Sequence, residues 1–360
     1  MRGVTPLLKR VVYPSLARAG VLRRMCGTGL AVLTYHGIRP REYQPIDAAF
    51  DGNLIDAETF RKQLVLLKKN YTIVSPDDVL AWCEERGKLS PRAVLLTCDD
   101  GLLNNLTDML PVLRQENLKC LFFVTGASAG DNRSTLWYED LFLIFLRAPA
   151  AQFEVACRNV TILGDLTKRE RRQAVWWSAV KRLSQVDGET RKAFLQEARR
   201  TLGVRSIDVS SSVEDRRFGL LVRDELRELA AAGMTIGAHT LNHPILSECP
   251  VEIAWTEIAE SRTRLEAALQ APVWAMAYPF GDRQSVTPGI LSRAREAGYK
   301  VAFMNCGGGL GAALPRHAIP RIHVTAQMNL AEFEANVAGF YAALQRRAGR
   351  NGEPGLQMAG

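Results

Sequence analysis

The sequence has no pair of cysteines with the spacing of a zinc site or a redox centre. Its seven cysteines are scattered along 360 residues, and an odd number cannot pair completely within one chain. Free thiols are typical of proteins in reducing compartments. We therefore expect reduced cysteines and a cytosolic environment.

The sequence also lacks a long apolar run. No stretch reaches the roughly 18 consecutive apolar residues that a membrane-spanning helix needs. The first 29 residues are interrupted by Pro6, Pro14 and Gly20, and their apolar stretches are too short for the core of a signal peptide. We expect a protein on the cytoplasmic side of the membrane.

Basic residues are in modest excess over acidic ones. Lysine and arginine number 46 against 38 acidic residues, for a formal net charge of +8. The basic residues are spread widely and are not interleaved with aromatic residues, so we expect a solvated basic surface and no nucleic-acid partner.

Residues 1–30 form a basic N-terminal segment with the pattern of an amphipathic helix. Such a helix can lie on an anionic membrane surface, which would give peripheral contact with the inner membrane. A helix docked on the protein's own core has the same pattern, and the sequence leaves both interpretations open. The basic residues of the segment include Lys9, Arg10, Arg18, Arg23 and Arg24.

The length and the ordinary composition, with 47% hydrophobic residues, suit a folded enzyme of one large α/β domain with an insertion. Apolar runs typical of buried strands alternate with helical patterns, which indicates a parallel βα architecture over 31–129 and 218–345. The expected strands are 31–37, 71–74, 93–96, 119–124, 234–238, 273–278, 301–304 and 319–324. The glycines of 307–311 lack a nucleotide-binding spacing, and 346–360 is expected to be a flexible tail.

The region 130–217 breaks this alternation and is expected to be a mostly helical insertion. Helices are predicted near 136–146, 168–183 and 189–202, with one strand at most, between Phe153 and Leu163. Trp137, Trp176 and Trp177 could stack on a sugar, although we favour aromatic packing within the helical insertion.

Two adjacent carboxylates, Asp99 and Asp100, directly follow the apolar run 93–96 and precede Gly101. Side chains at the C-terminal end of a buried parallel strand are where α/β folds place their chemistry. The simpler alternative is a strand followed by a turn.

His239 and His243 are four residues apart, and on one turn of helix this spacing would place both imidazoles on the same side. Two histidines and a carboxylate form a ligand set suited to a divalent transition metal with open coordination positions. The second carboxylate is then free to act as a base.

Several stretches in order resemble the NodB-homology polysaccharide deacetylases, also called carbohydrate esterase family four. They are Thr-Cys-Asp-Asp-Gly at 97–101, His-Thr-Leu-Asn-His at 239–243 and Ala-Tyr-Pro-Phe-Gly at 277–281. The opening Leu-Thr-Tyr-His, Phe-Phe-Val-Thr-Gly at 122–126 and Arg-Glu-Ala-Gly-Tyr at 295–299 agree with that family. The resemblance covers about 31–126 and 220–324.

The resemblance implies a distorted (β/α) barrel that hydrolyses an N-acetyl group of an amino sugar with a divalent metal, zinc or alternatively cobalt or manganese. It implies Asp99 as general base and Asp100, His239 and His243 as metal ligands. It also implies that Tyr278, Pro279 and Phe280 line the acetyl pocket, with the backbone N–H of Phe280 helping to hold the oxyanion. A metal that lowers the pKa of a water beside a carboxylate base agrees with this chemistry.

Two departures from the family pattern concern residues near the base. Cys98 stands where phenylalanine is usual, and we interpret it as a wall residue. Ala277 stands where many members have an arginine that orients the base. Arg321 is a candidate substitute, with an ordinary surface or salt-bridge role as the alternative.

A third departure concerns the acid that protonates the departing amine, for which the family uses a late histidine. His323, at the end of the last predicted strand, is the first choice, and a packed strand residue is its alternative. His36, at the end of the first strand, could reach the site to bind a substrate hydroxyl or the carboxylates. His317, in a predicted loop, is the weakest candidate.

These patterns favour a metal-dependent deacetylase of an N-acetylated glycan, which could be a polysaccharide, an oligosaccharide or a lipid-linked intermediate at the inner leaflet. A hydrolase of another C–N bond, such as a cyclic amide, is the enzymatic alternative. A non-catalytic carbohydrate-binding relative is the alternative from another class.

Overall fold

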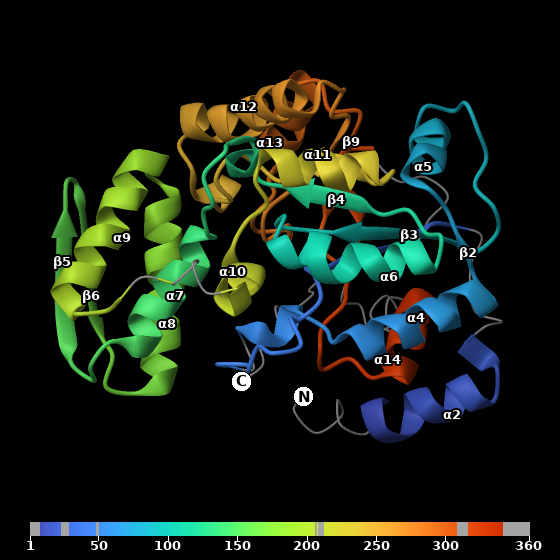
Figure 1. Cartoon of the computed structure of the whole chain (residues 1–360), viewed down its shortest axis with the longest axis horizontal. Helices are drawn as coiled ribbons and strands as arrows, with labels where there is room; N and C mark the ends of the chain where they lie inside the picture. The colour runs from blue at the N-terminus through green and yellow to red at the C-terminus, as the bar shows by residue number, and fades with distance from the viewer. Residues whose placement is uncertain are drawn as a thin grey trace.

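The computed structural model describes residues 8–22, 29–47, 50–205, 207, 212–307 and 316–340 (Figure 1). The predicted tail at 346–360, most of the glycine-rich loop at 307–311 and both flanks of residues 8–22 in the N-terminal segment lie outside the described residues.

A parallel sheet, nine-stranded over the described residues, forms the centre of the molecule, with helices around it (Figure 1). The sheet runs in the order β10, β9, β8, β7, β4, β3, β1, β11, and β2 pairs with β3. This arrangement confirms the predicted α/β barrel. The strands are β1 Ala31–Tyr35, β2 Thr72–Ile73, β3 Ala93–Cys98, β4 Leu121–Val124, β7 Thr235–Ala238, β8 Ala275–Ala277, β9 Val301–Met304, β10 Ile319–Pro320 and β11 Ile322–His323.

The strands β3, β4 and β9 are buried on both faces, which explains their nearly continuous apolar sequences. Along β3, Leu95 faces the barrel interior with Phe123 of β4 and Phe303 of β9. Leu96 and Val94 face the surrounding helices. Because strand side chains alternate in direction, Thr97 and Asp99 continue the inward series that Leu95 begins.

The barrel closes at Arg321. The sequence predicts one last strand from 319 to 324, but the structure divides it into β10, which pairs with β9, and β11, which pairs with β1. These two strands stand at opposite ends of the sheet order, and Arg321 alone separates them in sequence. Arg321 therefore lies at the seam where the two edges of the sheet meet.

The helices around the barrel agree with the sequence pattern. Ser75 forms a capping box with Asp78 at the start of α5 (Pro76–Cys83), as its position before Pro76 predicts. Pro111 lies in the first turn of α6 (Leu110–Gln115), where proline is tolerated, and α6 continues directly from η3 (Asn105–Met109). The others are α4 Ala57–Asn70, α11 Arg223–Ala231, α12 Val251–Leu269 and α13 Pro288–Glu296.

The insertion at 130–217 has a hydrophobic core of its own and lies to one side of the barrel (Figure 1). It contains α7 Trp137–Arg147, α8 Arg169–Ser184, α9 Gly188–Leu202 and α10 Ser212–Phe218. The single strand expected between 153 and 163 is instead an antiparallel hairpin of β5 Gln152–Cys157 and β6 Val160–Asp165. Arg158, at φ 52°, makes the turn that folds this apolar stretch back on itself.

A buried ion cluster joins the insertion to the barrel. Arg217 of α10 is 1% exposed, contacts Asp51 of η2 (Asp51–Asn53) at 3.0 Å and donates two hydrogen bonds to Glu139 of α7. A buried guanidinium with two carboxylate partners is costly to disrupt, so it holds the insertion in one position.

Part of the N-terminal segment is described as η1 (Leu8–Val12) and α2 (Tyr13–Arg18). It packs against α14 (Leu330–Val337), and Tyr13 and Leu22 are buried there with Ala335. Docking on the protein's own core therefore accounts for much of the apolar face of this segment. None of the described helices is long and apolar enough to cross a membrane.

Candidate active site

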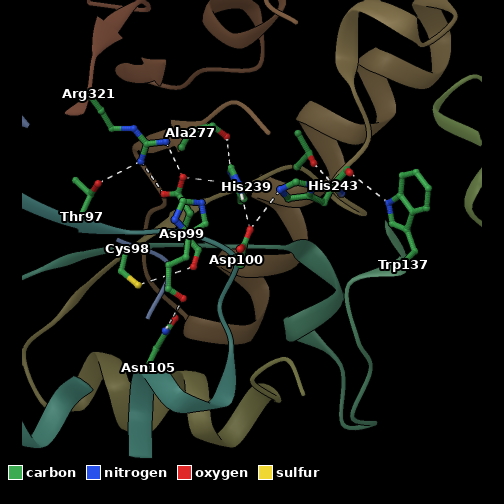
Figure 2. Close-up of polar contacts among 12 residues, drawn as sticks. Thr97, Cys98, Asp99, Asp100, Asn105, Trp137, His239, His243, Ala277 and Arg321 are labelled. Atoms are coloured by element: carbon green, nitrogen blue, oxygen red, sulfur yellow. Dashed lines mark hydrogen bonds and ion pairs between the residues drawn. The ribbon is translucent and has the colours of Figure 1, made fainter. Parts of the chain in front are cut away.

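The predicted catalytic residues meet at one end of the barrel because they follow the C-terminal ends of parallel strands (Figure 2). Asp99 and Asp100 follow β3, His239 follows β7, and His323 ends β11. Parallel strands present these ends on the same side of the sheet. The topology thus brings together side chains that are more than 200 positions apart in sequence.

The backbone turns sharply directly after Asp99. Asp100 has φ 76° and Gly101 has φ 75°, both in the left-handed region. A Cβ atom at Gly101 would lie 2.9 Å from the side chain of Val124, so glycine is required there on two grounds. A strained residue such as Asp100 persists only where its surroundings fix it, and such strain concentrates at functional sites.

His239 and His243 belong to a loop rather than to the turn of helix that their spacing suggests. Thr240 and His243 both have positive φ, which curls the loop so that the two imidazoles still face each other, 4.7 Å apart between ring centroids. Glu257 of α12 accepts hydrogen bonds from the backbone and side chain of Asn242 at 2.7 and 3.0 Å. The helix behind the loop thereby fixes its shape.

Asp100, His239 and His243 form a buried cluster whose ligand atoms lie within 4.8 Å of one another. Asp100 Oδ1 lies 3.6 Å from His239 Nε2 and 3.3 Å from His243 Nε2. His239 Nδ1 donates a hydrogen bond to the carbonyl of Ala277 at 2.8 Å (Figure 2). Because Nδ1 carries the proton, the free lone pair of the ring is on Nε2, the nitrogen that faces Asp100. A second ring nitrogen bound to a carbonyl is the usual arrangement of a metal-ligating histidine.

The residues of this cluster fit a divalent metal. Asp100 Oδ1 is buried and has no hydrogen-bond partner of good geometry, so a cation would satisfy it. Burial lowers the pKa of His239 to about 4, against the opposing effect of Asp99, so the imidazole is neutral as a ligand must be. Burial alone would raise the pKa of Asp100, but His243, His36 and the other nearby imidazole hold it well below its ordinary value.

Asp99 is held by Arg321 and lies beside the cluster. Both guanidinium Nη atoms donate to its carboxylate at 2.6 Å, and one also donates to Thr97 at 3.2 Å. Arg321 is fully buried, and Asp99 is 2% exposed. Burial alone would raise the pKa of Asp99, but Arg321 and then His239 outweigh it and leave the pKa below its ordinary value.

His323 and His36 form a second pair beside Asp99, with ring centroids 4.9 Å apart. His323 Nε2 and His36 Nδ1 are buried without hydrogen-bond partners in the described structure. Burial, followed by the charge of His36, lowers the pKa of His323 to about 3, so His323 is neutral at neutral pH. Both rings therefore have a nitrogen available to a ligand.

Only part of the segment 278–280, expected to line the acetyl pocket, lies at the site, and the rest packs in the core. The ring of Phe280, at φ 60°, lies 5.1 Å from that of His243. The side chain of Tyr278 instead packs in the outer core, and its hydroxyl donates to the carbonyl of His317. Pro279 is buried, and its carbonyl accepts from Gly281 N in the tight turn that presents Phe280.

His317 and Cys98 lie outside the catalytic geometry. His317 Nε2 contacts the carbonyl of Tyr299 at 2.8 Å, and both residues precede the N-terminal ends of strands, β10 and β9, rather than following a strand as the site residues do. Cys98 packs in the outer core, and burial raises the pKa of its thiol well above the ordinary value. A neutral, buried thiol is inert, as expected of a wall residue.

The insertion supplies two site residues that the sequence does not identify. Trp137 Nε1 donates to the carbonyl of His243 at 3.2 Å, and the ring of Tyr138 lies 4.7 Å from that of His243 (Figure 2 shows the Trp137 contact). No periodic pattern places these residues beside a loop more than 100 positions away. Their aromatic character, noted for Trp137, is the only signal in the sequence.

Comparison with known proteins covers most of the chain. The model of a family described as "Polysaccharide deacetylase" matches residues 86–302. No curated protein sequence matches. Among solved structures, the deacetylase PplD of Streptococcus pyogenes, in complex with acetate, has a TM-score of 0.55 and 17% identity over 86% of this chain and 98% of that chain.

Two further structures are similar to the same extent. IcaB from Ammonifex degensii has a TM-score of 0.53 and 18% identity, covering 87% of this chain and 98% of that chain. A de-N-acetylase from Aggregatibacter actinomycetemcomitans has a TM-score of 0.51 and 14% identity, covering 85% and 99%. At these identities the likeness shows a shared barrel fold.

Proposed function

The chain belongs to the polysaccharide deacetylase family and is a hydrolase that de-N-acetylates glycans; we propose that it does so with a divalent metal held by Asp100, His239 and His243. One observation carries the proposal. A buried carboxylate outside the ligand set, Asp99, lies beside the three-residue cluster and is fixed there by Arg321.

The metal and the carboxylate would have different tasks. When bound, a divalent cation such as zinc, cobalt or manganese polarises a carbonyl oxygen and lowers the pKa of water. Asp99, ionised at neutral pH because of Arg321, accepts a proton from the attacking water. The bidentate contact holds both carboxylate oxygens, which limits the rotation of the base.

His323 is the proposed proton donor to the departing amine. Because its low pKa leaves it neutral in the resting site, His323 takes up a proton from solvent during turnover and donates it to the amine, and Asp99 afterwards releases to solvent the proton it took from water. Negative charge developing on the substrate would raise the pKa of His323, because a nearby opposite charge favours the protonated imidazole. His36, in contact with that ring, is placed to bind a substrate hydroxyl, and the N–H of Phe280 is the proposed backbone donor to the oxyanion.

Release of acetate is the direct test. Purified full-length protein is incubated with zinc and N-acetylglucosamine oligomers, and acetate is measured enzymatically, with Asp99→Asn as control. We expect release by the wild type and a loss of at least 100-fold in the variant. Ring opening of a cyclic amide without acetate release would favour the alternative hydrolase, and a metal-free protein inactive on both would favour a non-catalytic relative.

The cellular location of the enzyme stays a prediction. We propose a cytoplasmic enzyme whose exposed basic residues Arg10 and Arg18 permit peripheral contact with an anionic membrane that carries a lipid-linked glycan. Flotation with vesicles containing 30% anionic lipid, roughly a physiological fraction, tests this. Replacement of both arginines by glutamate should abolish flotation, and equal soluble behaviour of both proteins would remove the idea.

A further inference from the structure

A cleft of about 460 Å³ lies between the insertion and the barrel, and we refer to it as the α8 cleft. One wall is a face of α8 that includes Gln173, Ala174 and Trp177, which recur at the spacing of adjacent helical turns. The opposite wall comes from two barrel loops and includes Ser247 and Gln284. Its lining is separate from the metal cluster.

The α8 cleft adjoins the metal cluster through two aromatic rings. Trp177 meets Phe280 edge to face with centroids 5.6 Å apart, and Phe280 lies 5.1 Å from His243. The loop that lines the cleft begins two residues after His243, and Ile245 N donates to Ser184 of α8 at 3.0 Å. The cleft and the metal cluster are therefore separated by the rings of Trp177 and Phe280 alone, a span that two or three linked sugars can bridge.

The lining of the cleft suits a sugar ring. Trp177 is half-buried, whereas Trp176 is buried with its indole N–H donated to the carbonyl of Tyr138, so Trp177 is the tryptophan with an exposed face. A flat aromatic surface can take the apolar face of a sugar, and the amides of Gln173 and Gln284 can pair with its hydroxyls. Concave sites with one aromatic wall and a few polar groups are typical of small-ligand sites.

The charges of the cleft select against anionic sugars. Its lining contains three carboxylates, Glu170, Glu248 and Asp282, against one ammonium group, Lys181, although the whole chain has a net charge of +8. Lys181 lies 4.0 Å from Glu248, so its charge is already partly balanced. A phosphate or a uronate placed there would be repelled by the excess of negative charge, whereas the ammonium group of a free amino sugar would be attracted by the carboxylates.

We propose that the α8 cleft is a subsite for an uncharged or positively charged hexosamine unit, next to the unit whose N-acetyl group enters the metal cluster. This inference rests on the proposed deacetylation and specifies its substrate. The enzyme acts on a chain of at least two sugars, accepts an already deacetylated neighbour, and keeps any phosphate or uronate of its substrate away from α8.

The test compares two variants with matched controls in the full-length protein. Trp177→Ala removes the aromatic wall, and Ala174→Arg fills the cleft from an exposed helical position without removing a contact. Ser178→Arg adds the same residue at an exposed position of α8 outside the cleft lining, and Trp255→Ala removes a tryptophan that is 41% exposed on α12.

Binding is measured by calorimetry with glucosamine tetramer, which has no acetyl group to hydrolyse, and with galacturonate tetramer. We expect both cleft variants to weaken binding of the glucosamine tetramer by about tenfold or more, and both controls to change it less than twofold. Unchanged binding in Ala174→Arg, or tighter binding of galacturonate than of glucosamine by the wild type, would overturn the proposal.

Acetate release gives an independent measurement. The preference of the wild type for N-acetylglucosamine tetramer over the monomer, as kcat/KM, should fall by about tenfold in both cleft variants, while the monomer rate is kept. Retention of the full preference would count against the subsite. If Trp177→Ala weakens binding of the glucosamine tetramer but the wild-type protein releases no acetate, the proposed deacetylation is refuted and the subsite is still supported.

Discussion

Replacing Arg321 by methionine should reveal two effects of the buried Arg321–Asp99 pair. One is on the free energy of unfolding, and the other is on the pKa and orientation of Asp99, the proposed base. Methionine has a similar length but leaves the Asp99 carboxylate, 2% exposed, without its two hydrogen bonds of 2.6 Å. Removing one partner of a buried ion pair typically costs about 3–5 kcal/mol. We expect a loss of that size in the free energy of unfolding, measured by denaturant titration at pH 7.

The pH dependence of this loss has a definite sign. In the wild type, the pKa of Asp99 is lower in the folded than in the unfolded chain, so the pair stabilises the fold above about pH 4 and its contribution is lost as pH falls further. Without Arg321, burial dominates and the folded pKa of Asp99 rises above the unfolded value. The variant should then lose stability relative to the wild type as pH rises from about 4.

Activity should follow the same shift. With a raised pKa, Asp99 is partly protonated at neutral pH and its carboxylate is free to rotate, so we expect kcat/KM for N-acetylglucosamine tetramer to fall by about 100-fold or more at pH 7. The ratio of variant to wild-type activity should increase between pH 6 and 9. Arg321→Lys should restore charge and part of the stability but not the bidentate contact, so its activity should stay low.

Arg217→Met is the matched control, because Arg217 is also buried and also makes two hydrogen bonds to one carboxylate, that of Glu139. We expect a comparable loss of stability without the change in the pH profile of activity. The reasoning would be refuted if Arg321→Met kept the wild-type pH profile, or if Arg217→Met shifted it equally.

The remaining predictions concern the metal, the proton donor and the turn. His243→Ala should abolish stoichiometric zinc, measured by elemental analysis of the folded protein, and retention of zinc would exclude His243 as a ligand. His323→Ala should lower the rate on an N-acetyl amide by about 100-fold or more but leave 4-nitrophenyl acetate hydrolysis nearly unchanged, because that leaving group needs no proton; equal losses on both would indicate a structural role. Gly101→Ala should cost at least about 1–2 kcal/mol in thermal or denaturant unfolding, since φ is 75° and the added Cβ would lie 2.9 Å from Val124. A Gly101→Ala protein of wild-type stability would show that the turn can relax.

Local patterns in the sequence were sufficient for most of the barrel. The inward series of Leu95, Thr97 and Asp99 follows from the period of a strand. The position of Asp99 at the mouth of the barrel could be predicted for the same reason. The alternation of side chains along a strand could not predict the turn of the backbone at Asp100. Its positive φ directs the carboxylate toward the histidines.

Contacts between distant segments account for what the sequence did not predict. The loop of His239 and His243 has the spacing of a helical turn, yet its shape depends on Glu257, a residue of the following helix. Trp137 and Tyr138 reach His243 only because the insertion has a separate core that docks beside the barrel. Such contacts are set by tertiary packing, which has no local signature.

The seam of the barrel explains how Arg321 reaches Asp99, which the short side chain of Ala277 does not contact. Ala277 faces the barrel interior with Phe123 and Phe303, and the guanidinium of Arg321 lies 5.2 Å from the ring of Phe123, so both positions open into the same interior space. Arg321 already neutralises Asp99 there, and a second buried guanidinium without a partner would be costly. The small side chain at 277 and the arginine at the seam are therefore two parts of one arrangement, in which the residue that joins the two edges of the sheet also holds the carboxylate of Asp99.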